Sequence, residues 1–187
     1  MDITRENALS LLKKHNSDVK HGLAVEAAMR YFAEKMGGDP ELWGFVGIIH
    51  DIDWEICVSE NDMSRHCNIA PQILREEGVS EDIIHAVQSH GYSICTDVKP
   101  ENDMEKTLFT IDELTGLIIT AGLVRPSKSL SDLEVSSVKK KWKDKAFARG
   151  VNREIIIKGA GMMGKPLEEI IEWVILALRP VEKEIGF

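Results

Sequence analysis

The 187-residue sequence has few cysteines, few aromatic residues and no long apolar run. Its three cysteines are an odd number without Cys-x-x-Cys spacing, so they suit a reduced protein better than a disulfide framework. The longest apolar runs, such as Val174–Leu178, fall far short of the ~20 residues that a membrane-spanning helix needs. The polar N-terminus lacks the apolar core of a secretion signal. The sequence therefore predicts a cytoplasmic protein that neither crosses nor binds a membrane.

Basic residues are in the minority, with 23 Lys and Arg against 31 Asp and Glu, and the formal net charge is −8. This balance argues against general nucleic-acid binding, which needs a basic surface. The basic residues are unevenly spread, because residues 124–153 contain nine Lys and Arg against three acids. We call residues 124–153 the basic segment.

Apolar residues recur at helical spacing along most of the chain, and no stretch alternates with the period of a strand. The length suits one domain, so the sequence predicts a single all-α domain over residues 1–187. Loops are expected near 53–64 and 92–103. The predicted helices cover residues 3–15, 20–37, 40–52, 65–77, 80–90, 104–123, 131–149, 151–160 and 167–179.

A glycine motif near the C-terminus resembles a dinucleotide-binding fingerprint, but its context is wrong. Three isoleucines at 155–157 are followed by the Gly-x-Gly-x-x-Gly pattern of Gly159, Gly161 and Gly164. A dinucleotide site needs a second strand with an acidic residue at its end about 20 residues further on. The predicted helix after Gly164 leaves no room for that strand. We therefore interpret the motif as a glycine-rich break between two helices.

Four of the six histidines and one aspartate lie on apolar helix faces. Residues three or four positions apart share a helix face, and His21, for example, shares one with Val25, Ala28 and Phe32. His85 and His15 instead lie on a polar face and at a helix end, and we expect structural roles for them. The inward-facing residues, from five predicted helices, are His21, His50, His66, His90 and Asp112.

Buried carboxylates need a partner, because burying an unpaired charge costs several kcal/mol. No Lys or Arg accompanies Asp51 or Asp112 on these faces. A divalent cation would compensate both carboxylates and orient the imidazoles. The alternative is that Asp51 and Asp112 cap helix ends or pair with histidines.

The motif FVGIIHDID, with VKHGLAVEAAMRYFA before it and TIDELTG after it, resembles the HD-domain superfamily of metal-dependent phosphohydrolases. The resemblance covers residues 20–120, and His66 and His90 extend it to the pattern of members with two metals. The stretch from DELTGLIITAGLVRPSKSL to SVKKKWKDKAFARGVNRE also resembles a small subgroup of uncharacterised bacterial predicted HD hydrolases. The implied fold is an HD-type helical bundle with its metal core over 20–120 and a basic helical C-terminal extension over 124–187. Many members have glycine where this chain has Asp53.

The resemblance also implies a ligand set. His21, His50, Asp51 and Asp112 would hold one metal, and Asp51 would bridge to a second metal held by His66 and His90. Four imidazoles and two carboxylates suit one or two ions of iron, manganese, nickel, cobalt or zinc.

The expected activity is hydrolysis of a small phosphorylated metabolite or nucleotide by a metal-activated water. Asp51 and Asp53 are the candidate catalytic residues, and Glu55 is an alternative to Asp53 for orienting the water. Arg125, Lys139 and Lys143 are candidate substrate-binding residues, because a phosphate ester needs basic partners. Trp142 is either a stacking surface for a base or a core residue.

Two other functions fit the same residues. One is a di-iron oxygenase related to the HD hydrolases, and the other is a module that binds a nucleotide or signal without turnover. The sequence leaves a monomer and a homo-oligomer both open.

Overall fold

The computed structural model describes all 187 residues, and it confirms the all-α prediction. The only β-type pairing is one isolated bridge between Tyr92 and Thr96. No helix combines the length and the apolar character that a membrane span requires. The helices are α1 (Arg5–His15), α2 (Lys20–Met36), α3 (Pro40–Ile49), α4 (Trp54–Ser59), the 3₁₀ helix η1 (Met63–Arg65), α5 (Ala70–Glu76), α6 (Glu81–Ser89), α7 (Asp103–Leu123), α8 (Val135–Trp142), α9 (Arg153–Met163), α10 (Leu167–Leu178) and the 3₁₀ helix η2 (Arg179–Val181).

Several helix starts are set by capping side chains that the sequence displays. The side chain of Asn102 accepts the backbone N–H of Glu105, and the Glu105 carboxylate returns a bond to the Asn102 backbone, which forms a capping box for α7. Asp39 caps α3 directly before Pro40. These caps fix where α3 and α7 begin, and both helices carry or precede residues of the candidate metal centre.

Three helices, α3, α5 and α8, are markedly shorter than predicted, and one short helix was not predicted. The helix α3 ends at Ile49, so His50 and Asp51 lie in the turn after it. The helix α5 begins only at Ala70, with Pro71 in its first turn, so His66 precedes it. The predicted loop 53–64 contains the short helix α4.

The third shortened helix is α8, which was predicted over 131–149 but covers only Val135–Trp142. Extending it would place Lys143 and Lys145 four residues after Lys139 and Lys141 on the same face. Such like-charge pairs destabilise a helix, and α8 ends before either pair is complete.

The glycine motif is only in part the break between two helices that the sequence predicted. The helix α9 runs through Gly159 and Gly161 to Met163, beyond the predicted end at residue 160, and the break comes at Gly164, which has the left-handed conformation. A Cβ at Gly159 would lie 2.1 Å from Thr110 Oγ1. Glycine at 159 therefore lets α9 approach α7 closely.

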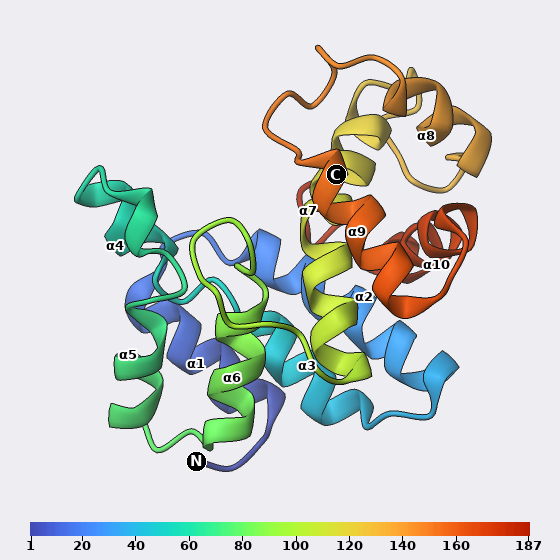
Figure 1. Cartoon of the computed structure of the whole chain (residues 1–187). Coiled ribbons are helices and arrows are strands. Elements are labelled where there is room, and N and C mark those ends of the chain that lie inside the picture. The colour runs from blue at the N-terminus through green and yellow to red at the C-terminus, as the bar shows by residue number, and fades with distance from the viewer.

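The long helix α7 lies between two groups of helices (Figure 1). The helices α1, α5 and α6 lie on one side of it, and α8, α9 and α10 lie on the other. The helices α2 and α3 pack against each other, with Phe32 and Phe45 fully buried in the core that they share. The helix α7 therefore carries Asp112 at the centre of the molecule.

Candidate metal centre

The structure brings together the six residues that were predicted to bind metal. Only two of them lie within helices, His21 in the first turns of α2 and Asp112 in the middle of α7. The others lie at helix ends or in turns, where the backbone leaves the helical path. They are His50 and Asp51 after α3, His66 after η1 and His90 after α6.

Three of the imidazole rings are oriented by their Nδ1 atoms. His50 Nδ1 donates to the carbonyl oxygen of Gly47 at 2.8 Å, and His90 Nδ1 donates to the carbonyl oxygen of Val87. His66 Nδ1 donates to Asp53 Oδ1 at 2.8 Å. A neutral imidazole that carries its proton on Nδ1 keeps a free lone pair on Nε2. The three Nε2 atoms are therefore prepared to bind a metal.

These Nε2 atoms face other nitrogen atoms at short distances. His50 Nε2 lies 3.2 Å from His21 Nε2, and His66 Nε2 lies 3.3 Å from His90 Nε2. Two lone pairs at this separation repel each other unless a proton or a cation lies between them. For His66 and His90 the Nδ1 partners account for the first proton of each ring, so a second proton or a metal cation fits the space between the Nε2 atoms.

The two carboxylates complete two sets of donor atoms. Asp51 Oδ1 lies 3.4 Å from both His66 Nε2 and His90 Nε2, and Asp51 Oδ2 lies 3.5 Å from His21 Nε2. Asp112 Oδ1 lies 2.8 Å from His21 Nε2 and 3.4 Å from His50 Nε2. Metal bonds of about 2.1 Å place neighbouring donors about 3.0–3.4 Å apart. The separations therefore suit the binding of a metal ion by these donors.

Without a metal, protons balance the charges of this cluster. Burial lowers the pKa of His21, but the hydrogen bond and the charge of Asp112 outweigh it and raise the pKa to about 9. Burial likewise opposes the hydrogen bond from His90 to Asp51, which raises the pKa of His90 to about 9. The pKa of Asp112 is well below its usual range, because the hydrogen bonds from His21 and His50 outweigh its burial. Pairing of histidine with aspartate thus describes the metal-free state, and a metal has to displace those protons.

Asp53 occupies a different position from the one expected of a catalytic residue. Its side chain is fully buried and does not line the cavity above the cluster. One carboxylate oxygen accepts the Nδ1 proton of His66, and the other accepts the backbone N–H of Ala70 at 3.0 Å. Both oxygens are therefore engaged, and Asp53 orients His66 instead of touching a water in the cavity. The structure therefore places Asp53 beside His66 and outside the cavity lining, and the catalytic role expected from the sequence stays a prediction.

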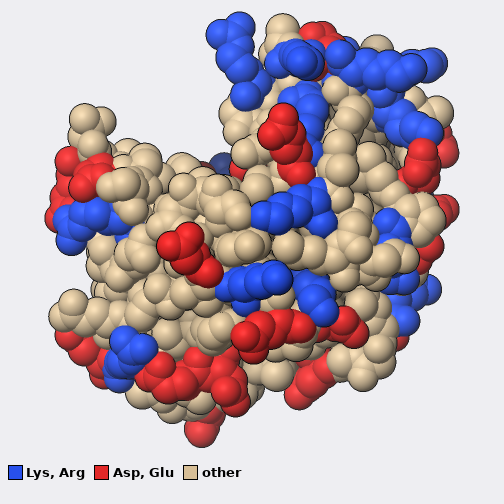
Figure 2. Space-filling model, viewed as in Figure 1, with Lys and Arg blue, Asp and Glu red and all other residues tan.

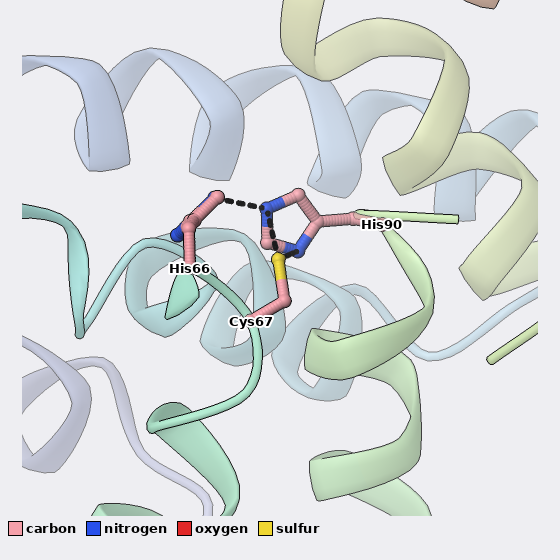
Figure 3. Close-up of side chains that lie close together, drawn as sticks. All are labelled: His66, Cys67 and His90. Atoms are coloured by element: carbon pink, nitrogen blue, oxygen red, sulfur yellow. Dashed lines mark hydrogen bonds between the residues drawn. The ribbon is translucent and has the colours of Figure 1, made fainter. Parts of the chain in front are cut away.

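The cysteine pair near the centre was not recognised in the sequence. Cys67 is buried against the imidazole of His90, with Sγ 3.6 Å from Nε2 and 3.8 Å from Nδ1 (Figure 3). Because both ring nitrogens are almost equally distant, the sulfur lies beside the ring and not along the Nε2 lone pair. Cys67 therefore packs against a predicted ligand, as a buried apolar residue would. Gly91 allows this packing, because a Cβ there would lie 2.6 Å from Cys67 Sγ and 2.5 Å from Cys95 Sγ.

The cluster forms the floor of a cavity of about 890 Å³. The walls come from the end of α1, the start of α2, α4, the turn at 91–95, the middle of α7 and residues 150–151. Five of the six predicted ligands line it, and the buried sixth, His50, lies beneath. Figure 2 shows the molecule hollowed between α4 and the lobe that carries α8.

The three basic residues of the predicted phosphate clamp do not line this cavity, although Gly150 and Val151 of the basic segment do. Arg125 forms an ion pair with Asp132 at 2.6 Å, and Lys139 forms one with Glu168 at 2.5 Å. Lys143 is exposed after the end of α8. None of the three is among the lining residues. Trp142 is half-buried with the Arg153 guanidinium 5.9 Å from its ring, and it lies outside the cavity as well.

The two remaining histidines lie outside the cluster. His85 Nδ1 lies 3.0 Å from Oε1 of Glu105, the residue that also caps α7. His15 is the last residue of α1, where the helix dipole stabilises a positively charged side chain. Both positions agree with the structural roles expected for them.

No model of a known protein family matches this chain, and no curated protein matches it significantly. The chemistry of the centre has to be inferred from its own donor atoms and from its cavity.

Proposed function

We propose that this chain is a metal-dependent hydrolase of the HD type that cleaves a small phosphate ester. One observation carries the proposal: the Nε2 lone pairs of three oriented histidines and two carboxylates converge at the floor of a large cavity. Such a donor set would be unfavourable in a packed core, because each buried lone pair would need its own hydrogen-bond donor. Its position beneath an open cavity supports a site that meets a small molecule.

The donor set fits two divalent transition metals that share Asp51. His21, His50, Asp51 and Asp112 would hold one ion, and His66, His90 and Asp51 would hold the other. When bound, two such ions supply an activated water and polarise a phosphoryl oxygen. The mixture of imidazole and carboxylate suits iron, manganese, nickel, cobalt or zinc.

The chain itself contributes orientation and a confined site. The Gly47 and Val87 carbonyls and Asp53 hold the rings of His50, His90 and His66, which leaves each Nε2 free. Asp51 has oxygens facing both donor groups and touches the cavity, so it remains the residue closest to the proposed reaction. Glu55 lines the cavity and keeps one carboxylate oxygen free of protein hydrogen bonds.

The proposal is tested by metal analysis of the purified protein together with phosphate release from small phosphate esters. We expect bound transition metal and hydrolysis, and loss of both in the His50→Ala variant. The His15→Ala variant, at the half-buried end of α1 and outside the cluster, is the matched control and should keep both. Metal-loaded wild-type protein that releases no phosphate from any ester would contradict the proposal.

Oxygen consumption and ligand affinity, measured on the same protein preparations, separate the two other candidates. A di-iron oxygenase would consume oxygen only when loaded with iron and would release no phosphate with zinc or nickel. A binding module would keep its affinity for a phosphate ester in the His50→Ala variant. Either result would replace hydrolysis as the proposed function.

A further inference from the structure

The cavity above the candidate metal centre lacks the basic residues that usually meet phosphate groups. None of its lining residues is Lys or Arg, whereas five carry carboxylates. Two of these carboxylates, Asp51 and Asp112, belong to the predicted ligand set. The other three, Asp18, Glu55 and Glu113, lie on the walls and form no ion pair with Lys or Arg. Arg149 directly precedes the lining residue Gly150, but it does not line the cavity itself.

Local hydrogen bonds hold the negative charge of Glu55 in place. Its Oε1 atom accepts the backbone N–H of Ser17 at 2.7 Å, the Ser17 hydroxyl at 2.9 Å and the backbone N–H of Asp18 at 3.2 Å. The hydrogen bonds from Asp18 and Ser17 lower the pKa of Glu55, so the side chain stays ionised. Asp18 similarly accepts the backbone N–H of Lys20 at 2.9 Å. Both carboxylates are therefore fixed features of the wall.

Another part of the cavity wall, around α4, is apolar instead of acidic, and its large apolar side chains face solvent. Trp54, Val58, Met63 and Ile94 are 44%, 53%, 39% and 55% exposed, and all four line the cavity. Side chains of this kind are usually buried, and a contiguous exposed group marks a binding surface. Trp54 packs edge-on against His66, with ring centroids 5.3 Å apart, so the apolar wall adjoins the predicted metal ligands. The helix α4 projects from the body of the molecule (Figure 1), and Trp54 and Val58 of α4 line the cavity.

These walls restrict what a substrate can carry beyond its reacting phosphoryl group. Two divalent metals would compensate one phosphoryl group, but no basic side chain in the cavity compensates a second anion. A second anionic group would instead meet the like charges of Asp18, Glu55 and Glu113 on the cavity walls and would be repelled by them. An apolar body would cover the exposed side chains of α4. The volume of about 890 Å³ lies in the range of small-molecule sites.

We infer that the substrate is a phosphate monoester whose remaining body is apolar and carries no second anionic group. This inference rests on the proposed hydrolase function and narrows it, because nucleoside diphosphates and triphosphates are excluded. An amine on the body is compatible with the acidic wall, whereas a carboxylate or a further phosphate is not.

The test uses three matched aryl phosphates that differ only in the charge of the ring substituent. They are phenyl phosphate, 4-(aminomethyl)phenyl phosphate and 4-carboxyphenyl phosphate, assayed by phosphate release with the metal-loaded protein of residues 1–187. We expect kcat/KM for the carboxy ester to be at least about tenfold lower than for the other two, which corresponds to about 1.4 kcal/mol. ATP should be hydrolysed no better than the carboxy ester.

The Asp18→Asn, Glu55→Gln double variant identifies the source of this discrimination. Both amides keep a side-chain oxygen that can accept the same backbone N–H groups, so only the charge is removed. The ratio of kcat/KM between phenyl and 4-carboxyphenyl phosphate should fall towards one in the double variant. The Glu172→Gln variant, on the exposed surface of α10, is the matched control and should keep the wild-type ratio.

The outcomes separate this inference from the proposed function. Hydrolysis of all three esters at equal kcat/KM, or efficient hydrolysis of ATP, would overturn the inference and leave the hydrolase function standing. An unchanged ratio in the double variant would overturn the role of the acidic wall. Failure to release phosphate from any ester with metal-loaded protein would refute the hydrolase function and the inference with it.

Discussion

The histidine and aspartate cluster and the basic segment were both singled out from the sequence, but only the cluster converges in the structure. The cluster residues come from positions 21–112 along the chain, and donor atoms lie 2.8–3.5 Å apart. In the basic segment, Arg125 and Lys139 instead form ion pairs with Asp132 and Glu168, and Asp132 is only seven positions from Arg125. Figure 2 shows Lys and Arg side chains gathered on the lobe that carries α8, beside the hollow.

The difference follows from burial. A polar side chain on an apolar helix face has to enter the core, and there it needs partners that only the tertiary structure can supply. A lysine or arginine on a solvated helix meets no such requirement, and it pairs with whichever acid is near. Buried polar residues therefore predict a site, whereas an excess of surface charge predicts only a charged surface.

The largest expected effect comes from Asp51, the residue whose oxygens face both groups of histidines. The Asp51→Asn variant keeps the shape of the side chain but removes the shared charge, so both metals should be lost. The loss in affinity should exceed the roughly 10–100-fold that follows loss of an outer partner of a ligand. Metal content after dialysis measures it, and Asp82→Asn on the exposed first turn of α6 is the control. Full metal content in Asp51→Asn would remove the basis for a shared site.

Asp53 should have the next largest effect, because it acts on the centre through His66. In Asp53→Asn the side chain has only one strong acceptor for the two bonds now made to His66 and Ala70. Affinity for the second metal should fall roughly 10–100-fold, while the first metal stays bound. Metal titration of the variant distinguishes this result from a catalytic role. A variant with two tightly bound metals but no turnover would instead support the catalytic role expected from the sequence.

The stability of the metal-free protein should also depend on pH through the histidine and aspartate cluster. His90 has a pKa of about 9 in the folded protein against 6.5 for an unperturbed histidine. The stability that its protonation contributes is fully present below pH 6.5 and is lost as pH rises through about 9. Urea unfolding of the metal-free protein should therefore show a falling free energy of unfolding over this range. Metal affinity should rise over the same range, because fewer protons compete. A flat stability profile together with pH-independent metal binding would show that His90 is not protonated in the metal-free protein.

Substitutions in the basic segment should have the smallest effect on metal binding and on activity. Removing three charges with Arg125→Gln, Lys139→Gln and Lys143→Gln in one chain alters surface pairs that lie outside the cavity. We expect no change in metal content or in KM for phenyl phosphate. A clear rise in KM would show that these residues reach the substrate, and the contrast between the two regions would then fail.

Much of the candidate site was predictable because helix periodicity shows which side chains point inward. The stripes through His21 and Asp112 lie in helices of nearly the expected extent. The positions of His50, His66 and His90 were predicted correctly as inward, but for an incomplete reason. They lie at helix ends, where the free backbone carbonyl or a neighbouring carboxylate orients the ring. The roles of Asp53 and Cys67 depend on contacts with residues 13 and 23 positions away, which spacing alone does not show.

The sequence by itself determined the all-α class, the start of most helices and the inward direction of the polar side chains. These features follow from local rules, namely caps, helical periodicity and the cost of burying a charge. Only the tertiary structure decided which inward residues meet, which ring nitrogen is left free and which charges stay outside the cavity. Those outcomes depend on how separate helices cross, and the crossing is set by packing between residues far apart in the chain.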